Sequence, residues 1–268
     1  MLPNLSSRGR ARGMVVVALC AAALALTGCS HRKLMLNSPT AVYQQAKKDL
    51  TDLDFNGAIK LFQRITAVFP FTPEARQAQL DLIYAYYRAG QDDSAVDAAN
   101  TFIRQNPTHP RVDYAWYMKG LVRFPKRANP IERLFGAKLS KRPPINVRKS
   151  FAAFRVVVTR FPHSIYAKDA WQRMIYLRDR LASYDTYVGR YYYTRGAYVA
   201  AVRRCQLVLE NYEGAPAVKS ALAIMILSYE RLGLKRLAAQ SRKVYAANFT
   251  GSVASAADIT VSHWWHFW

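Results

Sequence analysis

The chain is 268 residues long, carries a formal net charge of +22 and is 51% hydrophobic. This length and apolar content are sufficient to build a hydrophobic core. Lys and Arg are spread along the whole sequence and are not gathered in one stripe. This pattern argues against a dedicated nucleic-acid site and favours a solvated basic surface, attracted to anionic lipid or acidic partners.

The first 28 residues have the parts of an export signal. Three arginines (Arg8, Arg10, Arg12) precede an uncharged apolar run from Met14 to Leu26. This run of 13 residues is short, because about 20 apolar residues are needed to cross a hydrocarbon core of roughly 30 Å. We therefore expect residues 1–28 to form a signal peptide and not a membrane span.

Cys29 ends a Leu-Thr-Gly-Cys string that resembles the lipid-attachment site of bacterial lipoproteins. The resemblance implies cleavage before Cys29, a lipid on its thiol and acylation of the new amino group, so that residues 29–38 form a lipidated linker. Ser30 stands where lipoproteins kept in the inner membrane tend to carry Asp, which favours the outer membrane, facing the periplasm. The alternative is an ordinary cleavable signal with a cysteine nearby by chance.

The cysteine count is consistent with this interpretation. Cys20 lies in the signal and Cys29 receives the lipid, which leaves Cys205 alone and excludes an intrachain disulfide. The exported domain must then be held by its core. The basic charge would suggest binding to nucleic acid in a cytosolic protein. An exported protein does not meet nucleic acid, so we expect no nucleic-acid partner.

Helical patterns recur along the rest of the chain. In one unit, Leu82 and Tyr86 share a helical face and Gly90 breaks the helix. A second helical face then runs to a proline stop at Pro107. Its apolar positions are Ala95, Ala99 and Phe102. The order is helix, tight turn, helix and stop.

Similar signals for the end of a helix recur at Phe69, Asn106, Phe161, Tyr212 and Phe249, with steps of 37, 55, 51 and 37 residues. The small and aromatic positions resemble the tetratricopeptide repeat, and we predict an all-α solenoid of about five helix pairs. The pairs start near Pro39, Arg76, Asp113, Ala182 and Lys219. The pattern departs from the repeat at Lys119, which takes a usually apolar position, and at Arg242, which takes an aromatic one.

The unequal steps predict the domain organisation. Residues 39–163 form an N-terminal block of three units, with a loop insertion at about 124–146 that carries a short helix at Ile131 to Phe135. Ser164 is a good N-cap for a long helix reaching Val188, which joins this block to two further units. Residues 164–251 hold that helix and the C-terminal block, and residues 252–268 form an aromatic tail. A solenoid with a concave face suits protein binding better than catalysis.

Three strings carry a more specific resemblance: residues 79–88 (QLDLIYAYYR), 102–110 (FIRQNPTHP) and 113–121 (DYAWYMKGL). They resemble the BamD (ComL) family, lipoproteins of the outer-membrane β-barrel assembly machinery. The resemblance implies a non-enzymatic subunit that binds the periplasmic domain of BamA and other assembly-machinery lipoproteins. It also implies recognition of unfolded outer-membrane proteins through their C-terminal strand signal.

The same resemblance implies a partner-binding residue in the fourth unit. In the family, a basic residue of its second helix pairs with an acidic residue of BamA, and Arg204 matches that position. Arg203 is adjacent, so a shift of one residue stays open. The other interpretation is a solvated arginine on a basic protein.

For the substrate we expect a groove in the N-terminal block lined by Tyr84, Tyr87, Tyr114 and Tyr117. A peptide that ends in an aromatic residue and a carboxylate needs an apolar pocket and a cation. The cation would come from Arg88, Arg104 or Arg111. The alternative for each tyrosine is packing between helices, which is the commoner use of aromatics at helical spacing.

Catalytic and metal sites are not expected. No nucleophile, base and orienting acid can be placed together, and His263 with His266 on a short tail is weak evidence for a metal. Cys205 falls at a packing position between helices, which favours a buried small hydrophobe over a reactive thiol. We expect no cofactor besides the lipid on Cys29. Two other functions stay open: a periplasmic repeat adaptor linking cell-wall synthesis to envelope constriction and, with less support, an envelope hydrolase.

Overall fold

The structure is a computed structural model that describes residues 38–125 and 143–258. Within these ranges every regular element is an α-helix, which confirms the predicted all-α class. The helices all belong to one unit that begins at Pro39. They are α2 (Pro39–Thr51), α3 (Phe55–Val68), α4 (Pro73–Arg88), α5 (Asp92–Gln105), α6 (Val112–Val122), α8 (Ile145–Arg160), α9 (Ala167–Thr194), α10 (Tyr198–Asn211), α11 (Ala217–Arg231), α12 (Lys235–Asn248) and α13 (Val253–Ala257).

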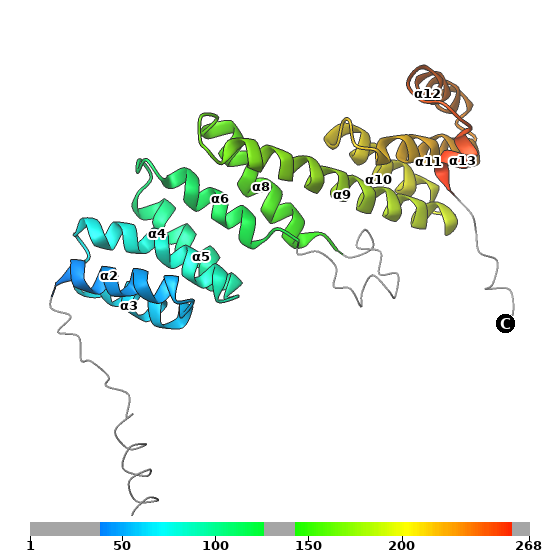
Figure 1. The fold of residues 1–268 in the computed structure, drawn as a ribbon. Coiled ribbons are helices and arrows are strands. Elements are labelled where there is room, and N and C mark those ends of the chain that lie inside the picture. The colour runs from blue at the N-terminus through cyan, green and yellow to red at the C-terminus, as the bar shows by residue number, and fades with distance from the viewer. Residues whose placement is uncertain (1–37, 126–142, 259–268) are drawn as a thin grey trace, which may run out of the picture. The chain divides into compact units, whose positions relative to one another are not determined.

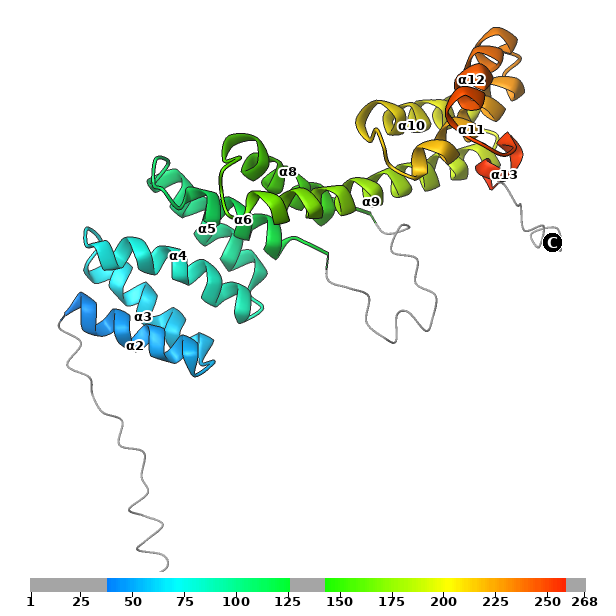
Figure 2. The same cartoon turned by 45° about the horizontal axis from the view of Figure 1, so that its top comes forward.

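Consecutive helices pack as pairs: α2 with α3, α4 with α5, α6 with α8, α9 with α10, and α11 with α12. The second helix of each pair also packs on the first helix of the next, so the pairs follow one another in chain order (Figures 1 and 2). This is the arrangement of a tetratricopeptide-like solenoid, and the described residues form the predicted five pairs.

The helix ends follow from local chemistry. The side chain of Asp54 accepts a hydrogen bond from the backbone N–H of Gly57 (2.9 Å), and Thr72 accepts one from Ala75 (3.2 Å), which caps α3 and α4. Gly90 has a φ of 73°, and this left-handed backbone lets the chain turn tightly from α4 into α5.

Close approach of the two helices in a pair depends on glycine at two positions. A Cβ atom on Gly120 of α6 would lie 2.7 Å from the ring of Phe154 on α8. A Cβ atom on Gly189 of α9 would lie 2.7 Å from Sγ of Cys205 on α10. Phe154 and Cys205 are fully buried, so the core relies on these glycines to admit the facing side chains.

The long helix after residue 162 is present, but the predicted cap at Ser164 is wrong. α9 begins at Ala167, and Tyr166 occupies the cap position without a capping side chain. Ser164 lies in the preceding turn, where its hydroxyl donates to Asp113 (2.6 Å). The turn between α8 and α9 includes Ser164, so the helix begins only after it. α9 then continues to Thr194, so the connecting helix and the first helix of the fourth pair are one element.

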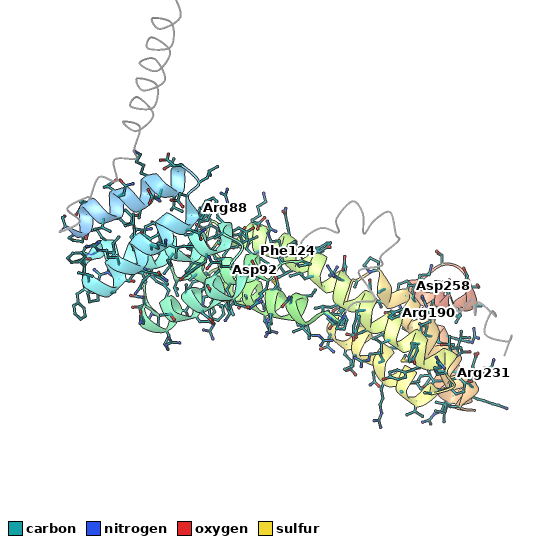
Figure 3. All side chains as sticks on the ribbon, turned by 90° about the horizontal axis from the view of Figure 1, so that it is seen from below. Arg88, Asp92, Phe124, Arg190, Arg231 and Asp258 are labelled. Carbon is teal, nitrogen blue, oxygen red and sulfur yellow. The ribbon has the colours of Figure 1, made fainter. Side chains whose placement is uncertain are left out.

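α13 closes the described part of the chain and packs on α11. Arg190 of α9 holds its end: Nε donates to the carbonyl oxygen of Ala257 (3.0 Å), and Nη1 lies 3.2 Å from a carboxylate oxygen of Asp258 (Figure 3). This short helix is therefore attached to the last two helix pairs.

Several predictions lie outside the described residues. These are the signal peptide at 1–28, Cys29 and its linker up to residue 37, most of the loop insertion (126–142) with its short helix at Ile131 to Phe135, and tail residues 259–268. The last two positions of the predicted insertion, 145 and 146, already belong to α8. The division into blocks at 39–163 and 164–251 stays a prediction. Within the described ranges, no helix is both long and apolar enough to cross a membrane.

Candidate partner and peptide sites

Arg204 lies on α10, the second helix of the fourth pair, and already has a partner within the chain. Its Nη1 atom donates to Oδ1 of Asp185 on α9 at 3.0 Å. The Asp185 side chain is 3% exposed, whereas the Arg204 side chain is 31% exposed. Arg148 on α8 approaches the same carboxylate oxygen at 3.6 Å. One buried acid therefore holds two arginines from neighbouring helix pairs.

These residues line a hollow of about 400 Å³ between α8, α9 and α10. Arg155 joins Arg148 and Arg204 in the lining, so the hollow contains three cations and one carboxylate. Burial, followed by the negative charge of Asp185, raises the pKa of Tyr212 at the rim. Apolar surface from neighbouring helices completes the lining, contributed by Phe151, Leu181 and Leu207. The excess positive charge suits an acidic side chain from another molecule.

Arg203 is exposed and does not line this hollow. The two adjacent arginines thus point to different surroundings, as neighbours on a helix must. The geometry favours Arg204 over Arg203 as the residue that faces Asp185 and the hollow. Its role toward a partner stays a prediction.

The four predicted groove tyrosines lie on α4 and α6, half-buried against one core of α4, α5 and α6. Tyr117 donates a hydrogen bond to Asp169 of α9 (2.7 Å) and stacks on Tyr166, with ring centroids 4.7 Å apart. Burial, then the bond to Asp169, raises the pKa of Tyr117 to about 12. The ring of Tyr114 also meets Tyr166, at 5.7 Å. Tyr114 and Tyr117 therefore attach α6 to the start of α9.

The predicted cations are divided among three places. Arg88 donates to the hydroxyl of Tyr84 (2.5 Å), and its guanidinium lies 4.8 Å from the ring centroid of Phe55. Arg111 lies 5.1 Å from the ring centroid of Tyr114. Arg104 is exposed on α5 and contacts Thr101. Within the described residues, neither the Arg204 hollow nor the two hollows of about 500 Å³ formed by α3 to α8 is lined by any of the seven predicted groove residues. The role of these seven residues in binding a substrate stays a prediction.

Comparison with known proteins decides the family. The family model described as "YfiO: Outer membrane lipoprotein" matches residues 35–244. An outer membrane protein assembly factor BamD from Neisseria meningitidis serogroup A is 38% identical over 229 residues, which is 85% of this chain and 86% of the relative. The chain belongs to the BamD family.

Other relatives extend the same match. BamD from Neisseria gonorrhoeae is 36% identical over 95% of this chain and 97% of its own length. BamD from Vibrio cholerae is 34% identical over 83% of this chain and 93% of its own length. The solved structure of MamA protein aligns with 80% of this chain and 97% of its own, at 16% identity and a TM-score of 0.37, a likeness too low to bear on function.

The sequence of this BamD-family chain did not lead to two residues of the Arg204 hollow, Asp185 and Arg148. Asp185 lies on a buried stripe of α9 in which Leu177, Leu181, Asp185 and Gly189 follow one another at intervals of four residues. An acid on a buried helical stripe signals a buried ion pair, because an unpaired charge there would be costly. Arg148 had no comparable signal, since its contact depends on how α8 packs against α9.

The described residues give no indication of a metal site, since no group of three or more His, Cys, Asp or Glu side chains is gathered there. Burial raises the pKa of the Cys205 thiol to about 12, with a small opposing effect of Arg190. The thiol is therefore protonated at neutral pH and acts as part of the core.

Proposed function

We propose that this chain is an outer membrane protein assembly factor that works by binding and not by catalysis. A lipid on Cys29 would hold it on the periplasmic face of the outer membrane. The C-terminal helix pairs would bind the periplasmic domain of BamA, beside other assembly-machinery lipoproteins. The N-terminal pairs would receive unfolded β-barrel proteins for folding and insertion.

The hollow around Arg204 carries this proposal. It presents three arginines and one buried carboxylate at the surface between α8 and α10. Asp185 fixes Arg204 and Arg148 in place before any partner arrives, which reduces the side-chain entropy lost on binding. A partner carboxylate entering the hollow would then meet preorganised cations.

The test is a pull-down from detergent-solubilised envelopes with tagged wild-type protein and three variants. Arg204→Glu reverses the charge beside Asp185, and Arg204→Gln removes it with less strain on the fold. Arg203→Glu is the matched control, because it makes the same reversal one residue away on an exposed position. Far-UV circular dichroism would establish that each variant is folded.

We expect BamA to be recovered with wild type and with Arg203→Glu, and to be lost or strongly reduced with both Arg204 variants. Loss of a close ion pair at an interface costs several kcal/mol of binding. Recovery of BamA with all four proteins would retain the assembly role and reject Arg204 as the docking residue. Absence of BamA from the wild-type sample would instead favour the periplasmic adaptor.

A further inference from the structure

The turn between the first two helix pairs exposes an apolar tip, which we call the Phe71 tip (residues 67–73). Phe71 is 92% exposed, and Val68 at the end of α3 is 58% exposed. Residues 65–73 contain no Lys, Arg, Asp or Glu. Single apolar side chains are common on protein surfaces, but here two large ones stand in one uncharged segment at the end of a turn.

The turn fixes this tip and leaves few of its backbone groups dependent on water. The Thr72 hydroxyl donates to the carbonyl oxygen of Phe69 (2.9 Å) and accepts from the N–H of Ala75 (3.2 Å). Pro70 and Pro73 have no N–H group, and the N–H groups of Phe69 and Thr72 donate within the chain. The tip can therefore enter an apolar phase with little loss of backbone hydrogen bonding.

The turn between the third and fourth helix pairs has a similar composition. Ile165 is 85% exposed there, and residues 161–167 contain no Lys, Arg, Asp or Glu. Exposed cations flank both uncharged segments: Arg64 and Arg76 beside the Phe71 tip, and Arg160 and Lys168 beside Ile165. Apolar side chains between cations are typical of segments that lie at a membrane interface.

The turns between consecutive pairs lie along one edge of the first three pairs, which we call the inter-pair edge (Figures 1 and 2). The first helix of each pair starts at this edge and the second helix returns to it. Side-chain hydrogen bonds connect neighbouring pairs along it, from Thr40 of α2 to Glu74 of α4 (2.8 Å) and from Ser164 to Asp113 of α6 (2.6 Å). The chain before Pro39 thus enters the helical unit at the edge that carries the Phe71 tip.

The inter-pair edge has a surplus of positive charge. Its three turns (69–72, 106–111 and 161–166), with five residues on either side of each, contain six cations and three carboxylates. They are Arg64, Arg76, Arg104, Arg111, Arg160 and Lys168, with Glu74, Asp113 and Asp169. All three carboxylates accept hydrogen bonds from side chains of the protein. Such an edge is attracted to an anionic lipid surface.

The opposite edge has the reverse charge in the first two pairs. The turns within these pairs (52–54 and 89–91), counted in the same way, contain five aspartates and three cations. They are Asp49, Asp52, Asp54, Asp92 and Asp93, with Lys47, Lys48 and Arg88. Leu53 is 63% exposed at this edge, but it stands among the aspartates. An anionic surface would repel these turns and so distinguishes the two edges.

The proposed anchor is the reason to choose a membrane as the partner of the inter-pair edge. The lipid proposed for Cys29 lies ten residues before Pro39, and ten residues span at most about 36 Å. The start of α2 therefore stays within this distance of the bilayer surface. A tether raises the effective concentration of the two surfaces it joins, so even a weak contact becomes populated.

We propose that the inter-pair edge is a membrane-contact surface, in which Phe71 and Ile165 enter the interface of an anionic bilayer and the flanking cations bind lipid phosphates. This inference rests on the lipid proposed for Cys29, and it goes further by assigning a face of the folded unit to the membrane. Anchor and edge would together fix the orientation of the helix pairs toward the bilayer.

The experiment places the mature, lipid-anchored protein on vesicles of phosphatidylethanolamine and phosphatidylglycerol whose acyl chains carry bromine as a fluorescence quencher. A dye is attached at Val68→Cys in the Phe71 tip or at Asp52→Cys in the opposite edge. Cys205 is buried, so the dye reacts with the introduced thiol. Flotation of the wild type and of Cys29→Ser with the vesicles tests the anchor separately.

We expect the lipid to quench the dye at residue 68 and not the dye at residue 52. Phe71→Ser should shift the balance between contact and release about tenfold toward release, because it removes a large apolar side chain from the interface. Leu53→Ser is the matched control and should leave the quenching unchanged. Both variants should unfold at the wild-type temperature, since both side chains are exposed. Quenching at residue 68 should be weaker on vesicles of phosphatidylcholine alone.

Absence of quenching at residue 68 in protein that floats with the vesicles would overturn the proposal, keep the anchor and leave a protein as the partner of this edge. Equal quenching at residues 68 and 52, or no effect of Phe71→Ser, would overturn it by showing no preferred edge. Equal quenching on neutral and anionic vesicles would overturn the role of the cations. If wild type fails to float, the anchor and this proposal fail together, while recovery of BamA in the pull-down still tests the assembly role.

Discussion

At the scale of single residues, burial decides what an aspartate contributes. Asp185 pairs with Arg204 of α10 at 3.0 Å, and Asp93 pairs with Arg123, the residue that follows α6, at 2.6 Å. The Asp185 side chain is 3% exposed, whereas the Asp93 side chain is 89% exposed. Water solvates the Asp93 carboxylate, so removing its charge would change the free energy of unfolding little. The Asp185 carboxylate is shielded from water, so its charge and those of the arginines around it stabilise one another.

Asp185→Asn should lower the free energy of unfolding by about 2–3 kcal/mol, because it leaves Arg204 and Arg148 side by side without their shared carboxylate. Asp93→Asn should change the same quantity by at most about 0.5 kcal/mol. Urea denaturation of the two variants measures both values. Equal losses would show that the Asp185 network adds no stability beyond that of a surface pair.

Cys205 gives a prediction on pH. Burial raises the pKa of its thiol from 9.0 to about 12, so the unfolded chain ionises this group first as the pH increases. The stability due to the neutral thiol is thus fully present below about pH 9 and is lost between about pH 9 and 12. We expect the fall in free energy of unfolding from pH 8 to pH 11 to be smaller in Cys205→Ala than in wild type. An identical fall in both proteins would contradict the assignment of a buried thiol.

At the scale of elements, the third helix pair shows how a helix-weakening residue stabilises the packing of two helices. Glycine inside a helix is less favourable than alanine by about 0.5–1 kcal/mol. In α6, however, a Cβ atom on Gly120 would lie within 2.7–2.9 Å of three ring atoms of Phe154. The carbonyl oxygen of Gly120 also accepts a bond from the hydroxyl of Ser150 on α8 (2.7 Å). The close contact between α6 and α8 requires the glycine.

Gly120→Ala should therefore destabilise the protein by about 1–2 kcal/mol, because overpacking against a rigid ring outweighs the gain in helix propensity. Phe154→Leu alone should also destabilise, since it removes buried apolar volume. The double variant should be more stable than the sum of the two effects implies, which thermal or urea unfolding of all four proteins would measure. Strict additivity would refute the proposed clash.

At the scale of the whole described unit, stability depends on how many neighbours each helix pair has. α9 packs against α8, α10 and α11 and buries eight residues. α12 packs on α11 and buries only Ala238 and Tyr245. In a solenoid the interfaces between neighbouring repeats supply much of the stability. A helix with fewer neighbours is then expected to open more often.

Hydrogen–deuterium exchange should accordingly be faster in the backbone of α12 than in α8 and α9. Mass spectrometry of peptic fragments would resolve these helices. Uniform protection across all of them would show that the unit opens only as a whole. The comparison is internal, so it does not depend on the absolute stability of the protein.

Much of the fold could be predicted because repeat architecture depends on local signals. Apolar residues at helical spacing, a glycine such as Gly90 in a turn and a proline such as Pro107 after a helix are all visible in the sequence. They predicted the all-α class and five helix pairs. Ser164 shows the limit, because its type suits a helix cap but it lies in the turn before α9. There its hydroxyl donates to Asp113, 51 residues earlier in the chain, and accepts from the backbone N–H of Tyr166 (3.2 Å).

The sequence by itself determined the family, the helix pairs and the position of Arg204 on the second helix of the fourth pair. Only the tertiary structure decided that Asp185 joins Arg204 to Arg148 and that Lys119 and Trp116 of α6 line one hollow with Lys149 and Arg155 of α8. The physical reason is the distance along the chain over which each kind of interaction acts. Helix periodicity and turn chemistry act over a few residues, whereas each of these clusters brings together side chains from different helices, and such contacts depend on how the helices pack against one another.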